Sequence, residues 1–143
     1  MLKKKHTKYI GIDYGKKRTG ISISDHNKVI SFPLDTIETK SLMFYLKDLI
    51  ENEKIEKVVI GKPLKLNNKL HELEIDIIQF IKSLKSIFPQ IIIERIDERY
   101  TSKISSLIIR QSGINQKSRM NKSIIDKISA SLILESYLTK INK

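Results

Sequence analysis

The segment from Tyr9 to Ser24 reads YIGIDYGKKRTGISIS, and its pattern decides the fold. Isoleucine occupies every second position in two short runs, one on each side of the basic stretch Gly15–Arg18. Alternation with a period of two is typical of a β-strand that has one face against a core. A tight polar turn between two such runs predicts an antiparallel pair of strands. The first of these strands is expected to end near Asp13.

The rest of the chain supplies a third short strand and then alternates helices with strands. Val29, Ile30 and Phe32 follow a polar turn and predict the third strand. Apolar residues at three- and four-residue steps predict helices, and short runs of valine or isoleucine predict buried parallel strands. In chain order, the further elements expected are a helix at 41–54, a strand at 58–60, a helix at 70–84, a strand at 91–96, a helix at 102–111, a basic polar loop at 115–121 and a helix at 123–140.

This order of elements predicts an α/β fold with one mixed five-stranded sheet. An antiparallel β-meander comes first, βαβ crossovers follow, and the helices pack on the sheet. No repeat or linker divides the sequence, so we expect a single domain over residues 1–143. The basic stretch at residues 1–7 is expected to be a flexible N-terminal tail.

The composition excludes several classes of protein. The chain has 143 residues, of which 40% are apolar and 30% charged, as expected for a globular domain and not for a disordered chain. It has no cysteine, which rules out disulfide scaffolds, zinc–thiolate sites and thiol nucleophiles. The three histidines are scattered without the spacing of metal ligands. No apolar run is long enough to span a membrane, and the basic start lacks the apolar core of a signal peptide, so we expect a cytoplasmic protein.

The chain is strongly basic. It carries 27 Lys and Arg against 16 Asp and Glu, a formal net charge of +11. Such an excess favours a polyanionic partner, because lysines that neutralise nucleic-acid phosphates release condensed counterions. The alternative is a solvated basic surface that reflects compositional bias, since lysine and isoleucine are both unusually common here.

Acidic residues stand at two predicted strand ends. Asp13 ends the first strand, and its side chain is expected on the same face as Gly11, which would leave open space beside it. Asp97 and Glu98 follow the strand at 91–96. The carboxyl ends of neighbouring parallel strands open onto a common crevice, so Asp13 and Glu98 can converge there.

A third acid is expected to join them from the last helix. Asp126 is placed in the first turn of that helix, and the small residues Ser129 and Ala130 would let the helix approach the sheet. Together with Asp13 and Glu98, it would surround one pocket with carboxylate oxygens, the hard ligands that Mg²⁺ or Mn²⁺ prefers. Two such ions could activate water and stabilise the leaving oxygen in phosphodiester hydrolysis.

Each acid also has a purely structural explanation. Asp13 could form an Asx turn, and Asp97 could cap the helix that follows it. Glu98 could be a solvated acid favoured by the helix dipole. Asp126 could be the third residue of a capping box that starts at Ser123.

Basic residues flank these acids. Lys17 and Arg18 follow Asp13 on a turn between Gly15 and Gly20, where exposed backbone N–H groups suit the approach of a phosphate. Further candidates for phosphate or backbone contacts are Arg99 and Thr101 after the acidic pair, and Lys117 and Arg119 in the loop before Asp126. For each cation, the alternative is a solvated surface charge, and for Thr101 a helix cap.

Four segments, in order along the chain, resemble the YqgF (RuvX) family of RNase H-like proteins. They are GIDYGKKRTG at Gly11–Gly20, VIGKPL at Val59–Leu64, DERYTS at Asp97–Ser102 and IDKISA at Ile125–Ala130. Members of this family are described as Holliday-junction resolvases and as nucleases that mature the precursor of 16S ribosomal RNA.

The resemblance implies roles for individual residues. The metal-binding catalytic acids would be Asp13, Glu98 and Asp126, and the supporting residues would be Arg18, Asp97, Arg99 and Thr101. The chain departs from the family pattern at residues 67–69, where many members carry a glycine, at Ser129, which replaces an alanine, and at residues 104 and 105.

The leading hypothesis is a divalent-metal-dependent endonuclease that processes the 5′ end of pre-16S ribosomal RNA, with Mg²⁺ or Mn²⁺ as cofactor and structured RNA, free or in a ribosomal particle, as partner. Asp13 and Asp126 would hold the ions, and Glu98 would bind metal or orient water. One alternative is a resolvase of branched DNA, whose two symmetric cuts call for a dimer. Another is a non-catalytic RNA-binding factor in ribosome assembly or transcription. A sugar-kinase-like phosphotransferase is disfavoured, because 143 residues leave no second lobe to enclose ATP.

Overall fold

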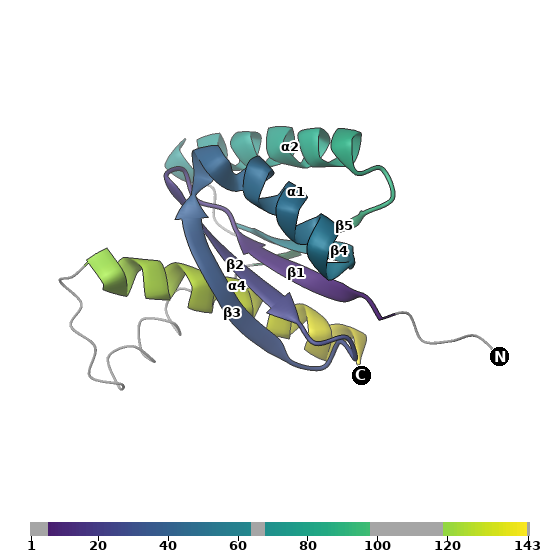
Figure 1. The fold of residues 1–143 in the computed structure, drawn as a ribbon. Helices are drawn as coiled ribbons and strands as arrows, with labels where there is room; N and C mark the ends of the chain where they lie inside the picture. Colours follow the sequence, from purple (N-terminus) through teal and green to yellow (C-terminus); the bar gives the residue numbers. More distant parts are fainter. Residues whose placement is uncertain (1–5, 64–67, 98–118, 143) are drawn as a thin grey trace.

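A computed structural model describes residues 6–63, 68–97 and 119–142 (Figure 1). The elements, in chain order, are β1 (Lys8–Asp13), β2 (Arg18–Ser24), β3 (Ser31–Glu38), the 3₁₀ turn η1 (Thr39–Ser41), α1 (Leu42–Glu53), β4 (Ile55–Lys62), α2 (Asn68–Ile87), β5 (Ile92–Asp97) and α4 (Arg119–Ile141). The helix expected at 102–111 and most of the expected N-terminal tail lie outside the described residues.

The five strands form one mixed sheet, as predicted. Their order is β3-β2-β1-β4-β5, with β1 in the centre. The pairs β1–β2 and β2–β3 are antiparallel, and the pairs β1–β4 and β4–β5 are parallel. The three parallel strands therefore end at the same edge of the sheet, where Asp13, Lys62 and Asp97 are their last residues.

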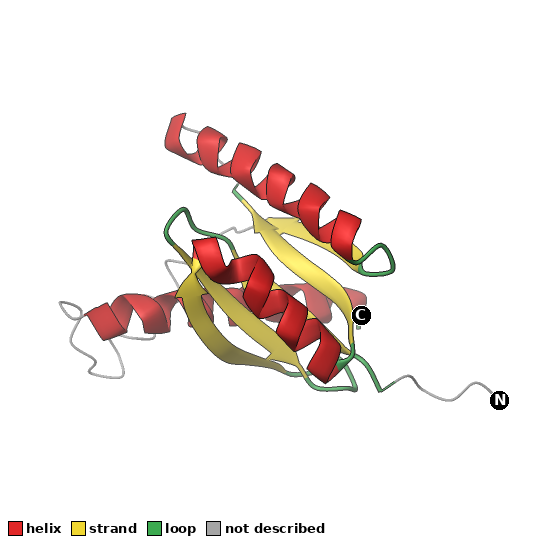
Figure 2. Cartoon of the chain, turned by 45° about the horizontal axis from the view of Figure 1, so that its top comes forward, coloured by secondary structure: helices red, strands yellow, loops and turns green. Residues whose placement is uncertain are grey.

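Helices cover both faces of the sheet, with α1 and α2 on one face and α4 on the other (Figures 1 and 2). The alternating isoleucines of β1 and β2 belong to the core under α1 and α2, where Ile10, Ile12 and Ile21 are fully buried and Ile23 is partly buried. On the opposite face, Tyr9 and Val59 pack against apolar residues of α4. Each face of the central strand β1 is thus buried under helices, which explains why its pattern was so informative.

Helix α4 approaches β1 and β2 unusually closely, because two glycines face it. A Cβ atom on Gly11 would lie 2.7 Å from the Cβ of Leu134 and 2.8 Å from the carbonyl oxygen of Ala130. A Cβ atom on Gly20 would overlap the backbone carbonyl of Asp126. Any side chain at these two positions would therefore push α4 away from the sheet.

The open space expected beside Gly11 does not exist, because α4 fills it. The helix is also fixed there by a polar contact from the sheet. The hydroxyl of Ser22 on β2 donates a 2.7 Å hydrogen bond to the carbonyl oxygen of Ala130, and both residues are buried. The prediction that small residues on the last helix allow its approach agrees with the burial of Ser129 and Ala130, although the sheet contributes the glycines.

The third strand lies later in the chain than predicted. It runs over Ser31–Glu38, whereas Val29 and Ile30 belong to the turn before it. The carboxylate of Asp25 accepts hydrogen bonds from the backbone N–H groups of both Val29 and Ile30, each at 2.8 Å. These bonds occupy donors that a strand ladder would need, so the apolar pair cannot join the strand.

The last helix begins earlier than predicted, at Arg119. Residues 119–121 were expected to belong to the basic polar loop, but Arg119 and Met120 are good helix formers. Ser123 therefore lies inside the helix, where its carbonyl accepts a hydrogen bond from the hydroxyl of Thr36 on β3. A capping box from Ser123 to Asp126 is thus wrong, and Asp126 lies beyond the first turn of α4.

Within the described residues, no helix is long and apolar enough to cross a membrane.

The close approach of α4 makes a direct prediction for Gly20. Gly20→Ala places a methyl group against the carbonyl of Asp126, so we expect the free energy of unfolding to fall by about 1–3 kcal/mol, the usual cost of overpacking. Urea denaturation of both proteins measures the change. Ser86→Thr adds one carbon at an exposed site on α2 and should change stability by no more than about 0.5 kcal/mol. Equal stability of Gly20→Ala and the parent protein would contradict the packing described here.

Candidate active site

Asp13 is the last residue of β1 and lies at the edge where the parallel strands end. In the β1–β2 ladder it stands directly opposite Gly20. Because side chains alternate along a strand, Asp13 shares a face with Gly11, which is the face covered by α4. Its side chain is half-buried there.

Asp126 reaches the same place from α4. Its backbone carbonyl lies over Gly20, the residue paired with Asp13. Its side chain keeps 22% of its surface exposed. Asp13 and Asp126 therefore both adjoin Gly20. The convergence of three acids on one pocket stays a prediction, because Glu98 lies outside the described residues. Gly20 lies buried within β2, and the linear sequence offered no sign that it would separate the two acids.

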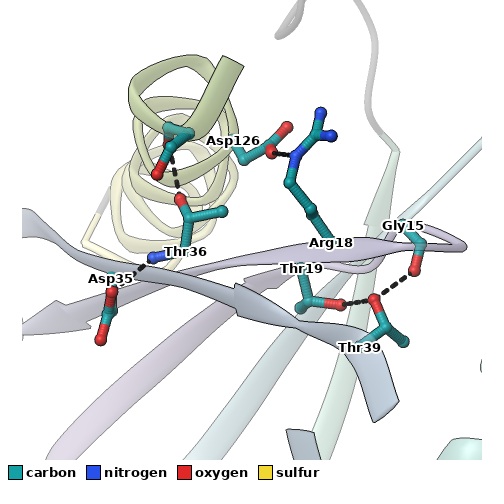
Figure 3. Close-up of polar contacts among 8 residues, drawn as sticks. Gly15, Arg18, Thr19, Asp35, Thr36, Thr39 and Asp126 are labelled. Atoms are coloured by element: carbon teal, nitrogen blue, oxygen red, sulfur yellow. Dashed lines mark hydrogen bonds and ion pairs between the residues drawn. The ribbon is translucent and has the colours of Figure 1, made fainter. Parts of the chain in front are cut away.

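An arginine holds the Asp126 carboxylate. The Nε atom of Arg18, at the start of β2, donates a 2.8 Å hydrogen bond to Oδ2 of Asp126, and the two groups form an ion pair (Figure 3). This bond uses Nε, so the two terminal nitrogens of the guanidinium can take further acceptors. Arg18 is 44% exposed, which leaves its outer end in contact with solvent.

Burial has the larger effect on the acidity of Asp126. It raises the pKa above the ordinary 3.8, because desolvation disfavours the charged form. The hydrogen bond and charge of Arg18, together with the charge of Lys122, lower the pKa but do not cancel this effect. The pocket around Asp126 therefore favours additional positive charge.

A network of threonines fixes the turn between β1 and β2. The backbone N–H of Thr39, in η1, donates to the carbonyl of Lys17 at 2.9 Å, and its hydroxyl donates to the carbonyl of Gly15 at 2.7 Å. The hydroxyl of Thr19 lies 2.8 Å from that of Thr39 (Figure 3). Lys17 and Arg18 are therefore carried by a turn that is anchored at several points. Sequence reasoning did not identify Thr39, because its role depends on contacts across three elements.

The other predicted site residues divide into two groups. Asp97 ends β5 at the same sheet edge and is exposed, in register with Lys62 on β4. Arg119 is the first residue of α4, so its assignment to a loop is wrong. Four predicted site residues lie outside the described part of the chain: Glu98, Arg99, Thr101 and Lys117.

The donor set present at this edge suits a divalent cation. The described residues contain no group of three His, Cys, Asp or Glu side chains that could hold a metal. Glu98, the third predicted ligand, lies outside the described residues. Asp13 and Asp126 offer carboxylate oxygens, the ligands that Mg²⁺ and Mn²⁺ prefer. The guanidinium already held by Asp126 demonstrates that this carboxylate binds positive charge.

Comparison with known proteins gives a consistent result. The sequence profile of the family described as "RuvX: Holliday junction resolvase" matches residues 7–140. Relatives with the name "Putative pre-16S rRNA nuclease" occur in Flavobacterium psychrophilum, Bacteroides fragilis and Karelsulcia muelleri, with 41%, 38% and 42% identity. Each of these alignments covers 92% of this chain, and 96%, 96% and 98% of the respective relative.

A solved structure shows the same fold. T. thermophilus RuvC in complex with a Holliday junction substrate superposes with a TM-score of 0.60, over 94% of this chain and 96% of the RuvC chain. The sequence identity is 10%, so the likeness concerns the fold alone. It confirms the RNase H-like architecture predicted from the sequence.

The raised pKa of Asp126 predicts how stability depends on pH. Since its pKa in the folded protein lies above the ordinary 3.8, the folded state binds more protons than the unfolded state in the interval between the two values. Ionisation of Asp126 therefore lowers stability as pH rises through that interval. We expect the stability of Asp126→Asn relative to the parent protein to increase from pH 3 to pH 7 in urea denaturation. A relative stability that decreases with pH would mean that the Arg18 ion pair outweighs burial.

Proposed function

The chain belongs to the RuvX family of Holliday junction resolvases, and we propose that it is a divalent-metal-dependent endonuclease. The observation that carries the proposal is the position of Asp13 and Asp126 on either side of Gly20, at the edge where the parallel strands end. Carboxylates that bind metal beside cations that bind phosphate are the groups that phosphodiester hydrolysis needs. We infer that its substrate is pre-16S ribosomal RNA, which the name of the relatives supports, and that it processes the 5′ end of this RNA in the cytoplasm during ribosome biogenesis.

In this proposal, Asp13 and Asp126 hold Mg²⁺ or Mn²⁺, and Glu98 binds metal or orients water. Bound at that place, a divalent ion would supply a water-derived nucleophile at neutral pH and stabilise negative charge on the leaving oxygen. Asp126 is well suited to this role because burial disfavours its unpartnered charge, so a cation in addition to Arg18 is favourable there.

Arg18 has two tasks in the same proposal. Its Nε orients the carboxylate of Asp126, and its terminal nitrogens donate to a phosphate oxygen of the substrate. The remaining assignments rest on the family resemblance and on position in the sequence. They make Asp97, Arg99 and Thr101 supporting residues, and they make Lys17, Lys117 and Arg119 contacts to the nucleic-acid backbone.

Resolution of branched DNA is the second candidate, and the description of the matching family favours it. It uses the same carboxylates and differs in its substrate and in its need for two coordinated cuts. A dimer on a four-way junction is therefore its distinguishing requirement.

The central prediction concerns Asp13. Asp13→Asn removes a negative ligand with little change in shape, so we expect cleavage of a 5′-extended 16S precursor fragment in Mg²⁺ or Mn²⁺ to fall by about a hundredfold or more. EDTA should abolish cleavage by the parent protein. The rate of appearance of the cut fragment on a denaturing gel measures both effects.

The matched control is Asp48→Asn, an isosteric change at an exposed site on α1, on the other face of the sheet. It should cleave at the parental rate. Parental rates for Asp13→Asn would show that the site is wrongly assigned. A four-way DNA junction run in parallel tests the resolvase alternative, and salt-sensitive RNA binding without any cleavage would favour the non-catalytic RNA-binding factor.

A further inference from the structure

We propose that a basic groove beside Asp126 binds the phosphodiester backbone of the RNA strand that enters the candidate active site. The groove has a volume of about 680 Å³ and is lined by Lys16, Lys17, Arg18, Glu38, Lys40 and Lys122. The inference rests on the proposed nuclease function and deepens it, because it adds Lys40 and Lys122 as substrate-binding residues.

The groove collects charge from elements that are distant in the sequence. Lys16 and Lys17 come from the β1–β2 turn, Lys40 from η1 and Lys122 from α4. With Arg18, the described residues of the lining are five cations and one carboxylate. A hollow with this excess of positive charge attracts a polyanion, and a nucleic-acid strand lies along such a groove through its phosphates.

Two groove lysines form ion pairs with carboxylates, and both pairs are exposed to solvent. The Nζ atom of Lys40 lies 3.0 Å from Oε2 of Glu38, and the two side chains are 82% and 66% exposed. The Nζ atom of Lys16 lies 3.7 Å from Oε2 of Glu72, and both side chains are more than two-thirds exposed. Exposed ion pairs of this kind contribute little free energy, so a phosphate can replace the carboxylate at small cost.

Arg18 connects the groove to the candidate active site. It lines the groove and at the same time donates through Nε to the carboxylate of Asp126 (Figure 3). Lys122 also acts on Asp126, since its positive charge lowers the pKa of that carboxyl. A phosphate bound in the groove would thus lie next to the acid proposed to hold metal, which gives the strand a continuous path to the site of cleavage.

The groove is also held in shape before any substrate arrives. The two bonds from Thr39 to the backbone of Gly15 and Lys17 tie the turn to η1, and Lys40 is the next residue along the chain. The lysine backbones on the two sides of the groove are therefore fixed relative to each other. Preorganisation of this kind lowers the entropic cost of binding.

The test measures how RNA binding depends on salt. A fluorescent U12 RNA is titrated in EDTA, at several KCl concentrations, with the parent protein, with Lys40→Gln/Lys122→Gln and with Lys47→Gln/Lys82→Gln. The second double variant is the matched control, because it removes the same charge from exposed positions on α1 and α2, which cover the other face of the sheet. Fluorescence anisotropy gives the dissociation constant at each concentration, and circular dichroism checks the fold.

Each lost contact to a single-strand phosphate should reduce the slope of log affinity against log salt by about 0.7. We therefore expect the groove variant to lose about 1.4 from the magnitude of this slope and the control to keep the parental slope. A parental slope for the groove variant, or an equal loss in the control, would overturn the proposal.

The outcome is separable from that of the cleavage experiment. Suppose that the parent protein does not cleave RNA, and that the salt dependence of RNA binding weakens in the groove variant but not in the control variant. The nuclease proposal then fails, and the groove is supported as an RNA-binding surface. If the parent protein cleaves RNA and both double variants keep its slope, the groove proposal fails by itself.

Discussion

Helix α4 can lie against β1 and β2 only because Gly11 and Gly20 present no side chain to it, and the rest of the structure depends on this constraint. The contact places the backbone of Asp126 over the residue that is paired with Asp13. It also lets Ser22 hydrogen-bond to the carbonyl of Ala130, which fixes the helix along its axis. The packing that closes this face of the sheet is thus the same packing that brings two distant carboxylates together.

The candidate site places a group of carboxylates next to a group of lysines, and the side chain of Arg18 contacts both groups. Carboxylates lie at the C-terminal end of β1 and in α4, and the groove lysines come from the β1–β2 turn, η1 and α4. Arg18 bridges them, because it pairs with Asp126 and also lines the basic groove. Burial disfavours the negative charge of Asp126 when it has no partner, so the site favours a cation next to this carboxylate. The groove favours phosphates, because its lining is mostly positive. A metal-dependent nuclease needs both preferences at adjacent positions.

Much of the fold could be predicted from the sequence, because the alternation in residues 9–24 reflects burial of the isoleucine face of β1 and β2 under α1 and α2. The approach of Asp126 to the sheet was expected because Ser129 and Ala130 are small, and both residues are buried against the sheet. The prediction for β3 was wrong because the Asp25 carboxylate captures the N–H groups of Val29 and Ile30. Gly20, Lys40 and Lys122 could not be recognised, since their roles arise from contacts between distant elements and leave no pattern in the linear spacing.

The central claim is that Asp13 and Asp126, placed by the contact of α4 with Gly20, form the core of a metal site. Anomalous diffraction from crystals soaked in Mn²⁺ tests it most directly, because the manganese signal locates the ion without reference to activity. The account predicts an anomalous peak within bonding distance of carboxylate oxygens from both Asp13 and Asp126. A crystal in which manganese binds elsewhere, while Arg18 remains the sole cation on Asp126, would contradict it.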